Sequence, residues 1–202
     1  MPRIRASTIE EHKRQTRAQI LDAAADLFRS YGYADTNLGD ISAFVGIGRT
    51  TLYEYFSDKE DVLVNLVEDR IPGVVEDLLG GVPDEVSTRE RLGELIVRGL
   101  EFVSSDDDLG SILMREVPRL SEPAQKRIRR AHKPLEDEVV RLCTLGIESG
   151  EFRQFDPVDA GRLVFSMMMA ASESLRRDRD AKGKMHEAAD TLVRFVFEGL
   201  AS

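Results

Sequence analysis

One short stretch of the chain gathers side chains that can hydrogen-bond to nucleic-acid bases and phosphates. The stretch Arg49–Phe56, RTTLYEYF, is predicted to form a short helix that buries Leu52 and Phe56 at positions i and i+4. The polar side chains left on its outer face are those of Arg49, Thr50, Thr51, Tyr53 and Tyr55. The major groove of DNA admits one helix and presents donor and acceptor edges that guanidinium, hydroxyl and phenol groups can pair with. We therefore expect these side chains to contact a DNA duplex.

A preceding helix and a glycine turn must position this reading helix. Asn37 is predicted to cap the preceding helix, and we also expect it among the DNA contacts. The residues predicted to face inward lie at spacings of three and four: Leu38, Ile41 and Val45. Gly46 can take the left-handed conformation that a sharp reversal needs, and Ile47 is expected to fill the hinge between the helices. The pattern indicates a helix-turn-helix.

The same residues carry a resemblance to a known family. The segment Gly46–Glu60, GIGRTTLYEYFSDKE, resembles the signature of the tetracycline-repressor (TetR) family of transcriptional regulators. The resemblance extends upstream through an Ile-Leu-Asp-Ala-Ala…Leu-Phe helix and a Gly-Tyr turn, within Ile20–Tyr33. The sequence departs from the family pattern at Gly39, Phe44 and Gly48, which affects the expected operator contacts.

The resemblance implies an all-α fold in two domains. Residues 1–58 would form a three-helix DNA-binding domain with the helix-turn-helix, and residues 59–202 a helical-bundle domain for effector binding and dimerisation. The implied function is a ligand-responsive regulator, most often a repressor, that binds a near-palindromic operator as a homodimer and is released by a small-molecule effector. Two reading helices would enter successive major grooves about 34–36 Å apart.

The resemblance also implies a division of labour among the contacts. The residues expected to fix the register on phosphates are Tyr53, Tyr55 and Lys59, and those expected to touch base edges are Arg49, Thr50 and Thr51. Lys59 stands at the start of the next helix, whose N-terminus favours anions in any case.

Composition and charge limit the functional classes. The 202 residues are 42% hydrophobic and 32% charged, as in a folded soluble protein. No run approaches the apolar length of a membrane span, and the N-terminus lacks the apolar core of a signal peptide. A single cysteine, Cys143, excludes an intramolecular disulfide. We expect a cytoplasmic protein without membrane contact.

The net charge of −9 is unevenly distributed. Residues 1–59 hold eight basic and eight acidic side chains, so the excess lies downstream. Asp40, Glu54 and Asp58 lie near the expected reading surface, which predicts modest nonspecific DNA affinity that weakens as salt rises. The first six residues are either a minor-groove arm or a disordered tail. Basic side chains at the start of the first helix face either a phosphate backbone or solvent: Lys13, Arg14 and Arg17.

Helix boundaries follow from caps, glycines and prolines. The first helix is predicted to begin at a Ser7 or Thr8 cap and to end at Gly32. The expected downstream signals are a cap at Ser57 or Asp58, an interruption at Pro72-Gly73, a cap at Ser87 or Thr88, a start at Ser121-Glu122-Pro123, a kink or division at Pro134, and a stop at Gly150. Two closing helices are predicted from Pro157 to about Arg177 and from about Lys184 to Leu200.

The closing helices have wide apolar stripes and small residues such as Gly161 that permit close packing. Such helices need an internal cover or a partner, and we expect a second copy of the chain.

In regulators that this chain resembles, a small molecule lies within the C-terminal bundle. The candidate lining here is Phe102, Leu113, Met114, Val139, Phe165, Met168 and Met169. The candidate polar anchors are Arg98, Glu116, His132 and Ser172. Methionine adapts to irregular apolar ligands, but the same residues could be ordinary core.

Two other functional classes compete with a regulator. An all-helical small-molecule enzyme would need a nucleophile–base pair, a phosphate loop or a metal-binding set, and the sequence has none of these motifs. We therefore expect no catalytic residues, no metal site and no cofactor. An interaction module without DNA binding is the second alternative, suggested by Gly39 and the acidic neighbours.

Overall fold

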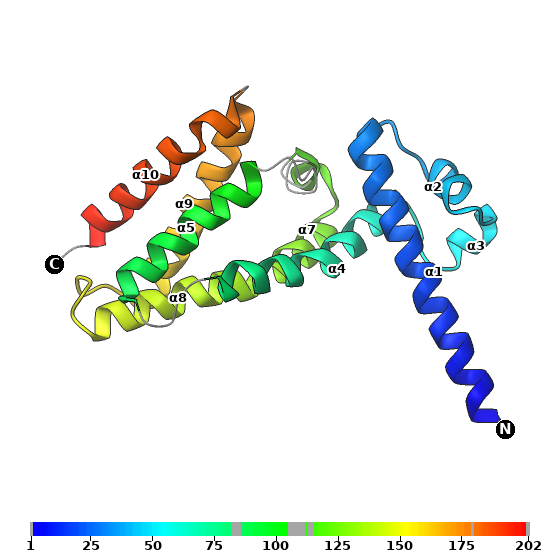
Figure 1. Cartoon of the computed structure of the whole chain (residues 1–202), viewed down its shortest axis with the longest axis horizontal. Helices are drawn as coiled ribbons and strands as arrows, with labels where there is room; N and C mark the ends of the chain where they lie inside the picture. Colours follow the sequence, from blue (N-terminus) through cyan, green and yellow to red (C-terminus); the bar gives the residue numbers. More distant parts are fainter. Residues whose placement is uncertain (1, 82–85, 105–111, 113–114, 179, 201–202) are drawn as a thin grey trace. The chain divides into compact units, whose positions relative to one another are not determined.

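The computed structural model of the chain describes residues 2–81, 86–104, 112, 115–178 and 180–200 (Figure 1). Over these ranges the backbone is helical with connecting turns and contains no β-strand, which confirms the predicted all-α class. Within the same ranges no helix combines the length and the apolar character that crossing a membrane requires.

The helices, in chain order, are α1 (Pro2–Tyr31), α2 (Leu38–Val45), α3 (Arg49–Tyr53), α4 (Lys59–Gly80), α5 (Thr88–Ser104), the 3-10 turn η1 (Val117–Arg119), α7 (Glu122–Ala131), α8 (Lys133–Glu148), α9 (Pro157–Arg177) and α10 (Ala181–Leu200). They form two compact units. The first unit contains residues 1–69 and 115–128, and the second contains residues 70–114 and 129–202. This division differs from the expected boundary between residues 58 and 59, because it splits α4 and adds a downstream segment to the N-terminal helices.

In the first unit, α1 packs against α2, and α2 packs against α3. The predicted apolar stripe of α1 is buried at Ile20, Ala24, Leu27 and Phe28. Tyr31, predicted to belong to that stripe, is instead 68% exposed. Gly32 ends the helix as predicted, with a left-handed φ of 87°.

The predicted start of α1 is wrong. The helix begins at Pro2, so Ser7 and Thr8 lie within it and do not cap it. Proline is well tolerated in a first turn, and the alanine, arginine and glutamate residues nearby favour helix, which explains the extra turns.

The second unit is a bundle in which α5, α8, α9 and α10 pack on one another. Gly161 of α9 confirms the predicted close approach of helices, since a Cβ atom there would lie 2.5 Å from Cα of Val140 on α8. The two helices meet backbone to backbone at this point.

Most predicted helix boundaries are confirmed by hydrogen bonds. Ser87 and Glu90 form a reciprocal cap before α5, with Ser87 N donating to the Glu90 carboxylate at 2.9 Å. Asp156 caps α9 by accepting from Val158 N at 3.0 Å. Near Pro134 the chain divides, as one of the two predicted outcomes, into α7 and α8.

The predicted interruption at Pro72 is wrong, because α4 continues through it to Gly80 (Figure 1). A proline inside a helix costs about 3 kcal/mol. Ile71 and Val75, on either side of Pro72, are both buried, and their packing offsets this cost.

Candidate DNA-binding site

The start of α2 is fixed by a reciprocal cap. The Oδ1 atom of Asn37 accepts from Gly39 N at 2.8 Å and from Asp40 N at 3.2 Å. In return, Asn37 N donates to Oδ2 of Asp40 at 2.9 Å. The predicted cap is confirmed, and the carboxylate of Asp40 is used within the motif.

A left-handed glycine produces the turn between α2 and α3. Gly46 has a φ of 78°, a conformation that residues with a Cβ atom rarely adopt. Its N–H donates to Ser42 O at 3.0 Å. Ile41 and Ser42 of α2 are buried, while the predicted inward residues Leu38 and Val45 are half-buried.

The reading helix α3 is shorter than predicted, ending at Tyr53 and not at Phe56. Tyr55 N and Phe56 N both donate to Leu52 O, at 3.0 and 3.1 Å, so the chain turns tightly after Tyr53. Leu52 and Phe56 are both buried, as predicted.

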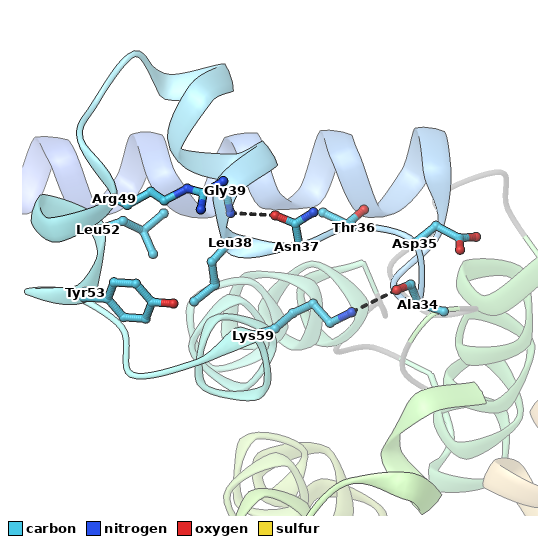
Figure 2. A pocket seen from close by; sticks show the side chains of 10 residues that line it. All are labelled: Ala34, Asp35, Thr36, Asn37, Leu38, Gly39, Arg49, Leu52, Tyr53 and Lys59. Atoms are coloured by element: carbon cyan, nitrogen blue, oxygen red, sulfur yellow. Dashed lines mark hydrogen bonds between the residues drawn. The ribbon is translucent and has the colours of Figure 1, made fainter.

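A hollow of about 440 Å³ lies where the beginnings of α2, α3 and α4 meet (Figure 2). Its lining is Ala34, Asp35, Thr36, Asn37, Leu38, Gly39, Arg49, Leu52, Tyr53 and Lys59. The hollow thus gathers four of the predicted DNA contacts: Asn37, Arg49, Tyr53 and Lys59. Tyr53 is 58% exposed, and its hydroxyl points into the hollow.

The other predicted contacts do not line this hollow. Thr50 is exposed beside Arg49, whereas Thr51 and Tyr55 are half-buried. The DNA contacts expected of these three residues stay predictions.

Lys59 is bonded within the protein. Its ammonium donates to the carbonyl oxygens of Tyr33 at 2.6 Å and Ala34 at 3.2 Å. It also lies 4.4 Å from the centre of the Tyr33 ring. Burial raises the pKa of Tyr33 to about 12, and the negative charges of Glu60, Glu116 and Asp58 add to the shift. Lys59 thus holds the turn after α1, a role that the sequence did not reveal.

Thr36 is another residue missed in the sequence. It is buried, and its hydroxyl donates to Gly32 O at 2.8 Å. Its place four residues after the helix-ending Gly32 was the available signal.

Arg17, one of the basic side chains considered for phosphate contact, is turned toward the protein. Its Nη2 donates to Oδ1 of Asn65 at 2.7 Å, and its Cζ lies 5.8 Å from the centre of the Phe56 ring. It joins α1 to α4.

Residues from the 115–128 segment hold the first part of α4. Arg127 Nε donates to Glu68 Oε1 at 2.9 Å, and its Nη1 lies 3.3 Å from Oδ1 of Asp61. Ser121 N donates to Glu60 at 2.8 Å. The hydrogen bond from Arg127 lowers the pKa of Glu68. No local sequence pattern indicates these contacts between distant residues.

Asp58, another acidic residue near the reading surface, caps a helix. Asp58 Oδ1 accepts from Asp61 N at 2.8 Å at the start of α4, which settles the choice between Ser57 and Asp58. The carboxylates of Asp40 and Asp58 are thus both used in helix caps.

The candidate effector residues occupy several environments in the second unit. Val139 and Met168 are fully buried, and Phe102, Phe165 and Met169 are half-buried. Leu113 and Met114 lie outside the described residues. Phe102 and Arg98 line a hollow of about 510 Å³ together with Val74, Asp77, Leu78, Glu94 and Glu101.

Two candidate anchors are already paired. Arg98 Nε donates to Glu94 at 2.8 Å. Glu116, which lies in the first unit and not with the other anchors, accepts from Arg115 at 2.8 Å. Within the described ranges, no group of three or more His, Cys, Asp or Glu side chains is placed to hold a metal ion.

Large apolar side chains are exposed on α9 and α10. Phe195 is 67% exposed and Leu163 is 64% exposed. Both line a hollow of about 360 Å³ between the two helices, and Phe195 also borders a second one of about 570 Å³.

Two family profiles match the chain. One, described as bacterial regulatory proteins of the tetR family, matches residues 20–66. The other, described as a tetracyclin repressor-like C-terminal domain, matches residues 85–200.

Individual proteins similar to this chain are also transcriptional regulators by name. The fatty acid metabolism regulator protein of Bacillus subtilis is 24% identical over 71% of this chain and 74% of its own length. The structure of the regulator FadR from Bacillus subtilis in complex with stearoyl-CoA has a TM-score of 0.72 at 22% identity, covering 87% of this chain and 97% of that one. A TetR-family regulator from Pectobacterium atrosepticum reaches a TM-score of 0.78 at 22% identity, over 95% and 97% of the two chains.

The C-terminal profile alone spans more than half of the 202 residues, and the N-terminal profile covers the helix-turn-helix described above. The chain belongs to the TetR family of bacterial transcriptional regulators, which are ligand-responsive DNA-binding proteins.

Proposed function

We propose that this regulator is a repressor that binds a near-palindromic operator as a homodimer and leaves it when a fatty acyl thioester binds. The observation that supports DNA contact most strongly is the hollow at the start of α2. It places the guanidinium of Arg49, the phenol of Tyr53 and the ammonium of Lys59 around one space (Figure 2).

These groups suit different parts of a duplex. Lys59 uses two donors on carbonyl oxygens, which leaves one N–H for a phosphate. The Tyr53 hydroxyl can donate to a phosphate of the same DNA strand. Tyr55 is a further phosphate contact in this proposal. Arg49, Thr50 and Thr51 would then reach base edges, with Asn37 offering its amide nitrogen beside them.

The homodimer would form through α9 and α10. The exposed Leu163 and Phe195 are large apolar side chains that a second copy would remove from water. A cytoplasmic location, with access to the chromosome, goes with this function.

The effector class is inferred from relatives. One relative is named for fatty acid metabolism, and one structural neighbour holds stearoyl-CoA. The relatives compared above are named as regulators, which supports a regulatory and not an enzymatic role. The hollow beside Phe102 carries three carboxylates and one guanidinium, so the phosphates of coenzyme A would need another part of the second unit.

Selection from a random duplex library with the full-length protein tests the proposed DNA binding. We expect enrichment of a near-palindromic site, and binding to it that weakens clearly at higher salt. If no duplex is enriched, the DNA-binding proposal is wrong.

The effector is tested on the selected duplex. Stearoyl-CoA should raise the melting temperature of the protein and release the duplex, whereas coenzyme A alone and free stearate serve as matched controls. A protein that responds equally to all three, or to none, would contradict a thioester effector.

A further inference from the structure

Gly39 and Arg49 compete for one space at the start of α2. A Cβ atom built on Gly39 would lie 2.5 Å from Nη2 of Arg49 and 3.0 Å from its Cζ. Non-bonded carbon atoms are most favourably placed about 3.5–4.0 Å apart. The guanidinium therefore occupies the place that a side chain at position 39 would take, as Figure 2 shows.

The backbone does not require glycine at this position. Among the described residues, positive φ angles are confined to Gly32, Gly46 and Gly150. Gly39 is part of a regular helix, and glycine is a weaker helix former than every residue except proline. What glycine provides here is space, and Arg49 fills it.

The guanidinium of Arg49 remains available to an outside partner. It is exposed, and within the described part of the chain it takes part in no hydrogen bond or ion pair. An arginine fork with free donors can pair with O6 and N7 of guanine, the commonest specific contact in the major groove.

We propose that Gly39 is a specificity-determining residue of the helix-turn-helix formed by α2 and α3. Because position 39 has no side chain, Arg49 of α3 lies against the first turn of α2, and this placement determines which base pair it reads. The inference rests on the proposed DNA contact of Arg49. Any side chain at position 39 displaces the guanidinium and weakens the base preference at that one position.

A purely structural explanation must be separated from this one. The same Cβ atom would lie 2.8 Å from Oδ1 of Asn37, so Gly39→Ala could weaken binding by disturbing the cap of α2. Such an effect would be independent of Arg49. The two explanations therefore differ in whether the consequence of Gly39→Ala depends on the residue at position 49.

A double-mutant cycle decides between them. Wild type, Gly39→Ala, Arg49→Ala and the double variant are measured by fluorescence anisotropy on the selected duplex and on all its single base-pair changes. Gly39→Ala should weaken binding about 5- to 150-fold and relax the same base pair as Arg49→Ala. In the Arg49→Ala background, Gly39→Ala should change affinity by no more than about twofold.

The matched control is Gly73→Ala in α4, where an added Cβ would meet nothing within 4 Å. It should leave both affinity and base preference unchanged, and thermal melting should show all variants folded. Equal losses from Gly39→Ala in both backgrounds, or a wild-type base preference in Gly39→Ala, would overturn the proposal.

A measurement without DNA distinguishes this failure from failure of the proposed function. The Nε–H resonance of Arg49, assigned by its absence in Arg49→Lys, should shift in Gly39→Ala and not in Gly73→Ala. An unshifted resonance overturns the proposal even if the duplex binds. If the resonance shifts but the protein selects no duplex, Gly39 and Arg49 share one space, and the proposed role of Gly39 in reading DNA is overturned.

Discussion

The ammonium nitrogen of Lys59 lies 2.6 Å from the carbonyl oxygen of Tyr33 and 4.4 Å from the centre of its ring. One side chain therefore connects the start of α4 to the turn that follows α1. Because α2 begins a few residues after this turn, Lys59 helps to fix the position at which the helix-turn-helix begins.

We expect Lys59→Met to affect both stability and DNA binding. Loss of the charged hydrogen bonds should lower the free energy of unfolding by about 1–2 kcal/mol. Loss of the proposed phosphate contact should reduce the slope of log affinity against log salt by about 0.9, equally on specific and random duplexes. Urea unfolding and anisotropy at several salt concentrations measure the two effects. A reduced stability with an unchanged slope would show that Lys59 acts on the turn alone.

The Glu68–Arg127 pair should make stability depend on pH. The pKa of Glu68 is lowered by the hydrogen bond from Arg127. A carboxyl group of this kind stabilises the fold above its unfolded pKa, about 4.3, and loses that contribution as pH falls through its lower folded pKa. Glu68→Gln should therefore be less stable than wild type at neutral pH, and the difference should shrink in acid.

Urea unfolding from about pH 7 down to about pH 3 tests this linkage. Glu148→Gln, which changes an exposed carboxylate on α8, is the control and should follow the wild type throughout. If the difference in free energy of unfolding between wild type and Glu68→Gln stays constant with pH, the linkage is contradicted.

Gly161→Ala should destabilise the second unit. The new Cβ would lie 2.5 Å from Cα of Val140, a backbone atom that cannot move without separating α8 from α9. Overpacking of this kind costs about 1–3 kcal/mol, against a gain of about 1 kcal/mol in helix propensity. Gly73→Ala gains the same propensity without a clash, so its stability should equal or exceed that of wild type. Comparable unfolding midpoints for the two variants would refute the close approach.

Leu163→Glu should convert the proposed dimer to a monomer. A carboxylate at this 64% exposed position would have to be buried without a partner in the interface. Light scattering coupled to gel filtration measures the mass, and operator affinity should fall with it. Leu145→Glu, at a 39% exposed leucine on α8, is the matched control and should remain dimeric. A dimeric Leu163→Glu protein would place the interface elsewhere.

Local features of the reading head could be predicted from the sequence. The Asn37 cap, the left-handed Gly46 and the buried pair Leu52 and Phe56 each depend on residues within four positions of one another. Neighbour sterics and helical periodicity determine such features. The resemblance to a family added what these rules could not, namely the function.

Features that depend on distant residues could not be predicted. Arg127 meets Glu68 across 59 positions, and no periodicity relates them. The course of α4 through Pro72 depends on burial of Ile71 and Val75, which tertiary packing decides. The close approach of Arg49 to Gly39 likewise depends on how α3 crosses α2, which the sequence motif leaves open.

The grouping of residues 115–128 with the N-terminal helices bears on how such regulators can be recombined. A chimera that joins residues 1–69 to a foreign effector half would leave Glu60 and Glu68 without Ser121 and Arg127. A working graft has to carry this internal segment along with the amino-terminal portion. The exchangeable module of this protein is thus discontinuous in its gene.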